Sequence, residues 1–103
     1  MVTIKFTFEA RDDLKNIYEY IGLDSKLQAK RFVKSLKQKT EILKQYPEIG
    51  KLIFPEKFKK LRQLLYQSYR IIYHISDNVV TVITIHHQSR LPENIPSVKN
   101  YNE

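Results

Sequence analysis

The sequence contains no cysteine and no tryptophan, and only two of its 103 residues are glycine. Without cysteine the chain has no disulfide, no thiolate zinc site and no cysteine nucleophile. The two glycines, Gly22 and Gly50, are far apart and cannot form the glycine-rich loop that cradles the phosphates of a nucleotide. We therefore expect no cofactor, and the lack of cysteine fits a cytoplasmic protein.

Long hydrophobic runs are also missing. No apolar stretch approaches the roughly 20 residues that a helix needs to cross a bilayer. Residues 1–6 alternate as a strand does and lack the charged start and apolar block of a signal peptide. The sequence therefore predicts a cytoplasmic protein with no membrane partner, folded as one domain over residues 1–103.

Acidic residues are few compared with basic ones: eleven Asp and Glu stand against eighteen Lys and Arg, which gives a net charge of +7. A field of this sign attracts polyanions such as nucleic acid or an acidic protein. The alternative is that the lysines only solvate the outer faces of the fold.

The hydrophobic periodicity predicts an α+β domain with the element order β-α-α-β-β-β. Strands are expected at 3–8, 61–66, 69–75 and 79–86, and helices at 9–21 and 25–43. The short connection between the helices predicts a helical hairpin, packed on one face of a small, mainly antiparallel sheet. Residues 47–60 are expected to form a loop, and the chain from about 91 an irregular tail.

Local signals predict how the two helices begin and end. Asp12 and Asp13 lie near the start of the first helix, where a carboxylate favours the positive end of the helix dipole. Gly22 is expected to end that helix in a left-handed conformation. Ser25, with Gln28 three residues later, is a capping-box signature for the second helix.

The last two strands are expected to meet in a two-residue turn at Asp77 and Asn78, because these residue types tolerate positive φ. This turn predicts four cross-strand pairs: Ile75–Val80, Tyr73–Val82, Ile71–Thr84 and Tyr69–His86. In this register Arg70 and His87 become diagonal neighbours on the open face of the sheet. A slip of one residue would separate them.

An arginine beside a histidine suits an anionic phosphodiester. The guanidinium of Arg70 supplies fixed donors to phosphate oxygens, and His87 can move a proton near neutral pH. The alternative is structural: Arg70 pairs with a loop carboxylate such as Glu48 or Glu56, and His87 only ends a strand. No metal site is expected, because His86 and His87 are adjacent in a strand and point to opposite faces.

Several short motifs follow one another along the chain. They are Ala10-x-x-Asp13-Leu14-x-x-Ile17-x-x-Tyr20-Ile21, Ala29-x-x-Phe32-x-x-x-Leu36, Leu43-x-x-x-Pro47-x-x-Gly50, Arg62, Tyr69-Arg70-Ile71-x-Tyr73 and His87-x-x-Arg90. In this order and spacing, from about residue 3 to 95, they resemble the RelE/ParE superfamily of bacterial type II toxins. The resemblance implies a growth-inhibiting toxin with the fold predicted above, neutralised by a cognate acidic antitoxin that is encoded beside it.

The two branches of this superfamily differ in their target. ParE-like members poison DNA gyrase, whereas RelE-like members enter the ribosome and cut mRNA, many with a tyrosine or histidine near the C-terminus. The Pro47-x-x-Gly50 signature, the capped hairpin and the His-x-x-Arg ending resemble the ParE-like branch, and Tyr101 is the one possible counterpart of the RelE-like tyrosine. We expect gyrase as the target, with ribosome-dependent mRNA cleavage as the alternative and a toxin-fold binder with little activity as a second alternative.

The resemblance and the charge pattern together give a set of candidate residues. If the protein is a nuclease, Arg70 corresponds to the arginine on the scissile phosphate and is expected to act with His87 and Arg90. The candidates for binding nucleic acid or the target are Lys57, Lys59, Lys60, Arg62, Arg70 and Arg90. The basic sheet face and loop 57–62 are expected to contact the acidic antitoxin.

Overall fold

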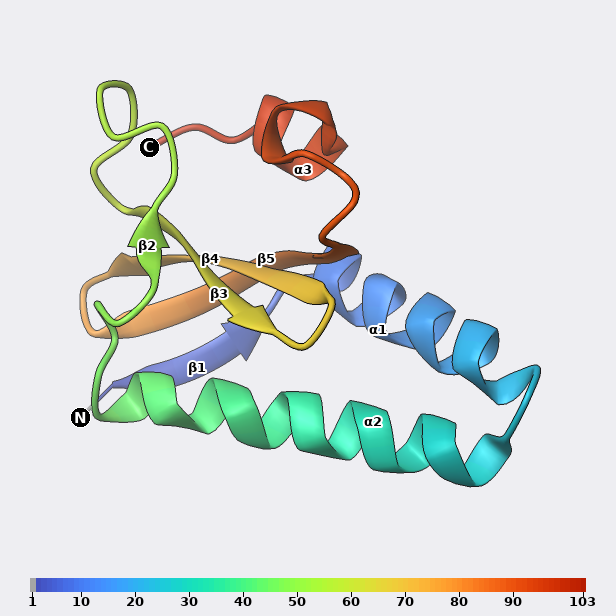
Figure 1. The fold of residues 1–103 in the computed structure, drawn as a ribbon. Helices are drawn as coiled ribbons and strands as arrows, with labels where there is room; N and C mark the ends of the chain where they lie inside the picture. Colours follow the sequence, from blue (N-terminus) through green and yellow to red (C-terminus); the bar gives the residue numbers. More distant parts are fainter. Residues whose placement is uncertain (1) are drawn as a thin grey trace.

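The computed structural model describes residues 2–103, which form a five-stranded sheet with a helical hairpin on one face and a short C-terminal helix on the other (Figure 1). The elements are β1 (Thr3–Phe6), α1 (Phe8–Gly22), α2 (Lys26–Thr40), a 3-10 turn (Glu41–Lys44), β2 (Lys51–Leu52), β3 (Leu61–Tyr66), β4 (Tyr69–Ser76), β5 (Val79–His87), a second 3-10 turn (Pro92–Asn94) and α3 (Pro96–Lys99). The strand order is β1-β5-β4-β3-β2, with β1 parallel to β5 and the other pairs antiparallel. The predicted α+β class is confirmed.

The helical hairpin forms as predicted, but its ends differ in detail. The hydroxyl of Thr7 accepts from Ala10 N and caps α1, so the helix begins at Phe8 and its first-turn acid is Glu9. The predicted strand 3–8 therefore ends at residue 6, and the two aspartates lie one turn too late to serve the helix dipole. The left-handed end expected at Gly22 is also wrong, because among residues 2–103 no glycine has positive φ. Ser25 caps α2 as predicted, accepting from Gln28 N.

The hairpin buries its apolar stripes against the first face of the sheet. This core holds Ala10, Leu14, Ile17, Leu36, Leu43, Leu64, Ile71, Tyr73, Val80, Val82 and Ile85. The members from the helices recur at the three- and four-residue spacing of one helix face, and those from β4 alternate along the strand. Among the described residues, no helix has both the length and the apolar character to pass through a membrane.

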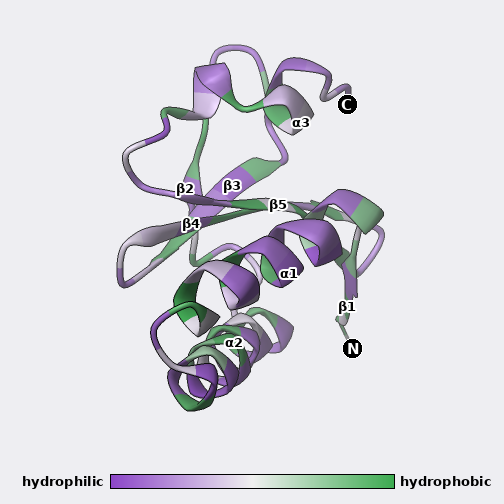
Figure 2. Ribbon diagram, turned by 90° about the vertical axis from the view of Figure 1, so that its right-hand side faces the viewer, coloured by the Kyte–Doolittle hydropathy of each residue, from purple (hydrophilic) through white to green (hydrophobic). Residues whose placement is uncertain are grey.

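The C-terminal segment packs on the second face of the sheet, so the prediction of an irregular tail from residue 91 is wrong. Ile95 and Val98 are buried against Phe58, Leu61 and Ile72 in a second hydrophobic cluster. Figure 2 shows α3 and the hairpin on opposite sides of the sheet. The sheet face predicted to be open is therefore largely covered by the chain's own end.

The pairing of β4 with β5 follows the predicted register near the turn and departs from it farther away. Asp77 and Asn78 have φ of 52° and 62°, as a two-residue hairpin turn requires. An irregularity between Ile72 and Tyr73 then leaves Ile83 without a partner. Beyond it every pair shifts by one residue, so that Arg70 faces His86.

The 47–60 segment contains the short strand β2, which the sequence analysis missed, and it is anchored by one buried tyrosine. The hydroxyl of Tyr73 donates to Pro47 O at 2.8 Å and accepts from Gly50 N at 2.9 Å. A Cβ atom at Gly50 would meet that hydroxyl at 2.5 Å and Gln63 O at 2.7 Å. The Pro47-x-x-Gly50 motif thus holds the loop against the sheet.

Candidate functional site

Arg70, at the start of β4, is held by three neutral acceptors. Its Nη1 donates to Gln63 Oε1 at 2.9 Å, its Nη2 to Gln88 O at 3.0 Å and its Nε to Arg90 O at 3.2 Å. Within residues 2–103 no carboxylate lies at ion-pair distance from it, so the alternative pairing with Glu48 or Glu56 is wrong. A guanidinium has five N–H donors, so two remain for a ligand and the full charge is uncompensated.

Arg90 lies beside Arg70, as the sequence analysis expected. Its backbone carbonyl receives the bond from Arg70, and its own Nη2 donates to Asn94 O at 3.3 Å. The Arg90 side chain is exposed, and the residue lies three positions after the end of β5. Together the two arginines form a positive site at the end of the sheet, which can bind a phosphate or carboxylate group.

His87 does not join this site, so its predicted position beside Arg70 is wrong. The one-residue shift places it opposite Tyr69, with the two rings edge to face at a centroid distance of 5.5 Å. Its Nδ1 accepts from Ser89 N at 3.1 Å and lies 2.9 Å from the Ser89 hydroxyl. His87 is exposed, but its ring nitrogen is engaged on the side of the strand away from Arg70.

His86 and Asp13 take part in the site and were missed in the sequence analysis. The Asp13 carboxylate accepts from Ile85 N at 2.9 Å and from the Thr84 hydroxyl, and it lies 3.8 Å from His86 Nε2. The Asp13 carboxylate lies at the edge of β5 beyond the end of β1, because β1 pairs with β5 only as far as Val82. Burial lowers the pKa of His86, with Asp13 raising it and Arg90 lowering it further. The sequence signal for this role was the position of Asp13 in the helical motif, directly before an apolar residue, Leu14, that is buried in the structure.

The basic residues of the 57–62 loop do not gather around Arg70. Arg62 donates to Glu48 O at 2.9 Å and Gly50 O at 2.7 Å, so it supports the loop. It lies three strand positions, about 10 Å, from the residue that faces Arg70.

The three lysines of this loop also have partners of their own. Lys57 lies over the Phe58 ring at 5.2 Å, Lys59 Nζ donates to Pro55 O and the backbone of Lys60 donates to Glu103. All three are exposed, so their charges still face solvent.

Tyr101 is fixed on the covered face of the sheet. Its hydroxyl lies 3.1 Å from His74 Nδ1, and its ring packs edge-on against Phe58. Burial, with a smaller effect of Glu103, raises the pKa of Tyr101 to about 12. Burial and then Lys60 lower the pKa of His74. This pair lies four positions along β4 from Arg70, about 13 Å, so it forms a separate feature.

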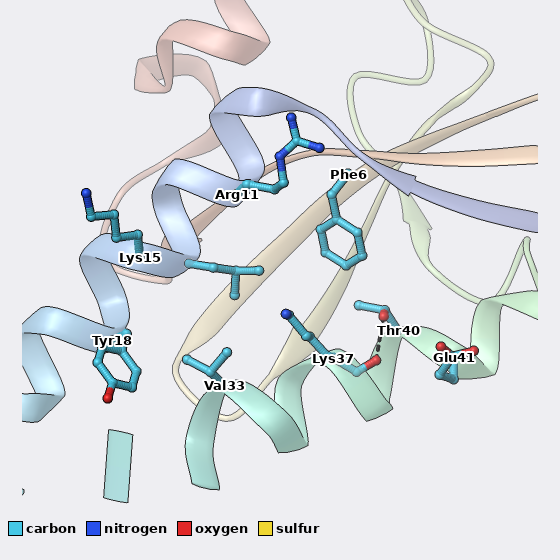
Figure 3. Close-up of a pocket in the computed structure, with 9 residues that line it drawn as sticks. Phe6, Arg11, Lys15, Tyr18, Val33, Lys37, Thr40 and Glu41 are labelled. Carbon is cyan, nitrogen blue, oxygen red and sulfur yellow. Dashed lines mark hydrogen bonds between the residues drawn. The ribbon is translucent and has the colours of Figure 1, made fainter. Parts of the chain in front are cut away.

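A groove of about 590 Å³ runs between α1 and α2 and is bordered by Phe6 of β1. Figure 3 shows Phe6, Val33 and Lys37 pointing into it, whereas the ends of Arg11 and Lys15 point away from its centre and Glu41 lies at one end. The groove therefore combines an apolar floor with a rim on which three basic residues outnumber the single carboxylate, Glu41. This combination fits an amphipathic segment that carries carboxylates beside apolar side chains.

Comparisons with known proteins agree with this architecture. Residues 4–92 match the family described as the ParE toxin of the parDE type II toxin–antitoxin system. The chain is 36% identical over 92 residues to Toxin RelE2 of Caulobacter vibrioides, in an alignment that covers 88% of this chain and the whole relative. It also resembles a solved chain of the chromosomal ParDE toxin–antitoxin system from P. aeruginosa, with a TM-score of 0.71 and 21% identity over 84% of this chain and 96% of that one.

Proposed function

The chain belongs to the RelE/ParE superfamily of type II toxins, and from this membership we propose that it arrests growth by poisoning DNA gyrase. The observation that supports a binding mechanism is that each histidine among residues 2–103 is engaged by another side chain, including His86, which pairs with Arg70 across β4 and β5. His74 bonds Tyr101, His86 faces Asp13 and His87 bonds Ser89. Cleavage of a phosphodiester by acid–base chemistry needs a proton carrier within reach of the phosphate. Poisoning of gyrase needs only a rigid contact surface.

Ribosome-dependent mRNA cleavage is the second candidate. It is favoured by one specific observation, the uncompensated charge of Arg70, whose two free donors suit a scissile phosphate. In this mechanism Arg70 would bind the phosphate, Arg90 would add charge, and His87 would move a proton after leaving its contacts with Tyr69 and Ser89. The third candidate is a toxin fold that binds its partner without activity.

One comparison in vitro separates these candidates. Purified toxin is added to gyrase with supercoiled plasmid, and in parallel to ribosomes translating a defined mRNA. We expect linear plasmid to accumulate after detergent and protease treatment, and the mRNA to stay intact. Cut mRNA without trapped gyrase would overturn the proposal, and the cut should then be lost in Arg70→Ala and His87→Ala. The inert-binder candidate predicts neither effect and no growth arrest on induction.

The toxin is expected to be neutralised by a short acidic antitoxin, and the hairpin groove is the surface that suits it best. Arg11, Lys15 and Lys37 outnumber Glu41 among the charged residues that line the groove, and its floor is apolar. An acidic amphipathic segment would meet both features at once. The exposed loop lysines Lys57, Lys59 and Lys60 offer a second positive surface to the antitoxin or the target. Both proposed targets are cytoplasmic, which is where this function places the protein.

A further inference from the structure

The outer side of α2 carries a concentration of positive charge, of which the groove proposed for the antitoxin uses Lys37 alone. The helix contains five lysines and one arginine and neither Asp nor Glu. It therefore contributes six positive charges to a chain whose net charge is +7. Five of these six residues are exposed, and within residues 2–103 none of the six takes part in an ion pair.

Four of the lysines form a straight row. Lys26, Lys30, Lys34 and Lys37 are separated by four, four and three residues, which confines them to a sector of about 80° on the helix. At 1.5 Å per residue the row is about 16 Å long. Figure 1 shows α2 as a straight helix along one margin of the molecule, below the sheet. The lysine row is thus a rigid line of charge at the surface.

Helix stability does not explain this arrangement. Lys26 and Lys30, and Lys30 and Lys34, are like charges four residues apart, a spacing at which they repel. The first turn of α2 contains no acid, so the positive end of the helix dipole faces Lys26 without compensation. Both effects weaken the helix. A row that opposes the stability of its own helix, and has no partner in the fold, points to a ligand outside it.

We propose that the lysine row binds the phosphate backbone of double-stranded DNA without reading its sequence. Lysines act as point charges on phosphates and lack the planar fork that recognises a base edge. Single strands fit less well, because they need exposed aromatic rings for stacking, and Phe32 of α2 is packed against Tyr66 and Tyr69. An acidic peptide needs an apolar floor, which lies in the hairpin groove, and Lys26, Lys30 and Lys34 do not line that groove although Lys37 does. This inference goes beyond the gyrase proposal and does not depend on it.

The test measures binding of the full chain to a labelled 30-base-pair DNA duplex by fluorescence anisotropy over a series of salt concentrations. The variant Lys26→Gln/Lys30→Gln/Lys34→Gln removes three charges from the row and keeps good helix formers. The control Lys5→Gln/Lys51→Gln/Lys99→Gln removes three exposed charges elsewhere. Each lost phosphate contact lowers the slope of log K against log salt by about 0.9, so we expect the row variant to lower it by about 2.7. The control is expected to change it by less than about 1.

Equal losses in the two variants would overturn the proposal, because they would show a response to net charge alone. Binding of an RNA duplex or of poly-glutamate as tightly as DNA would also overturn it. The variant Lys26→Arg/Lys30→Arg/Lys34→Arg should retain DNA binding, and thermal unfolding of every variant shows whether α2 is intact. Loss of DNA binding with unchanged trapping of gyrase would support the DNA site as a separate function.

Discussion

At the scale of single residues, Tyr73 explains a motif that the sequence analysis could only recognise. It is fully buried in the middle of β4, and its hydroxyl joins Pro47 O and Gly50 N. Both loop groups would otherwise be polar atoms without a partner near an apolar core. Burial is the largest influence on the Tyr73 hydroxyl and raises its pKa. Glycine at 50 is required by this close approach and not by backbone conformation.

The two glycines of the chain provide a matched pair of variants. Gly50→Ala places a Cβ atom 2.5 Å from the Tyr73 hydroxyl and 2.7 Å from Gln63 O, and overpacking of this kind costs about 1–3 kcal/mol. Gly22→Ala meets its nearest neighbour, Ala29 Cβ, at 3.8 Å and should be neutral or stabilise α1 by up to about 1 kcal/mol. Urea unfolding of both variants measures the difference. Equal free energies of unfolding would contradict the proposed anchoring role of Gly50.

The candidate site could be predicted from sequence only in part, and the reason lies in one residue. Arg70 and Arg90 were correctly placed together, because an arginine in an apolar strand and another just after its partner strand share one end of a hairpin. His87 was misplaced because Ile83 is skipped in the ladder. Such an irregularity arises from three-dimensional packing and leaves no mark in the alternation of side chains.

At the scale of elements, the prediction succeeded where local rules decide the structure and failed where tertiary contacts do. The two helices with a clear apolar stripe are present as predicted, and so are the two strands joined by the turn at Asp77 and Asn78. Strand β2 was missed because two residues carry no periodicity. The two prolines of the C-terminal segment predict an irregular tail. In the structure those prolines start the 3-10 turn and α3, and Ile95 between them reaches the core.

The packing of the C-terminal segment predicts a clear effect on stability. Ile95 is fully buried, and truncation of a buried isoleucine to alanine costs about 2–5 kcal/mol. Leu91 lies four residues earlier and is half exposed, so Leu91→Ala should change the free energy of unfolding by less than about 0.5 kcal/mol. Chemical unfolding of Ile95→Ala and Leu91→Ala compares the two. If both variants unfold as the parent does, the segment does not pack as described.

At the scale of the whole molecule, both faces of the sheet are covered by the chain itself. The hairpin covers one face and residues 91–101 cover much of the other. We therefore propose that partners meet the hairpin and the arginine site at the end of β4 and β5. The positive charge is also concentrated on the hairpin, because α2 contributes six positive charges to a net charge of +7. Long-range attraction should thus bring any acidic partner toward the hairpin first.

The hairpin groove gives the last prediction, which concerns the antitoxin. The variant Lys15→Glu/Lys37→Glu reverses two charges at the groove rim, whereas Lys5→Glu/Lys51→Glu changes the net charge equally on exposed positions elsewhere. Like charges across an interface are costly, so the groove variant should bind the acidic antitoxin about tenfold more weakly than the control, or about 1.4 kcal/mol. Affinity of the parent should fall as salt rises, because surface charges are screened. Titration calorimetry with the cognate antitoxin, which we expect to be a short acidic protein, measures both effects. Equal weakening in the two variants would show that the antitoxin responds to net charge and docks outside the groove.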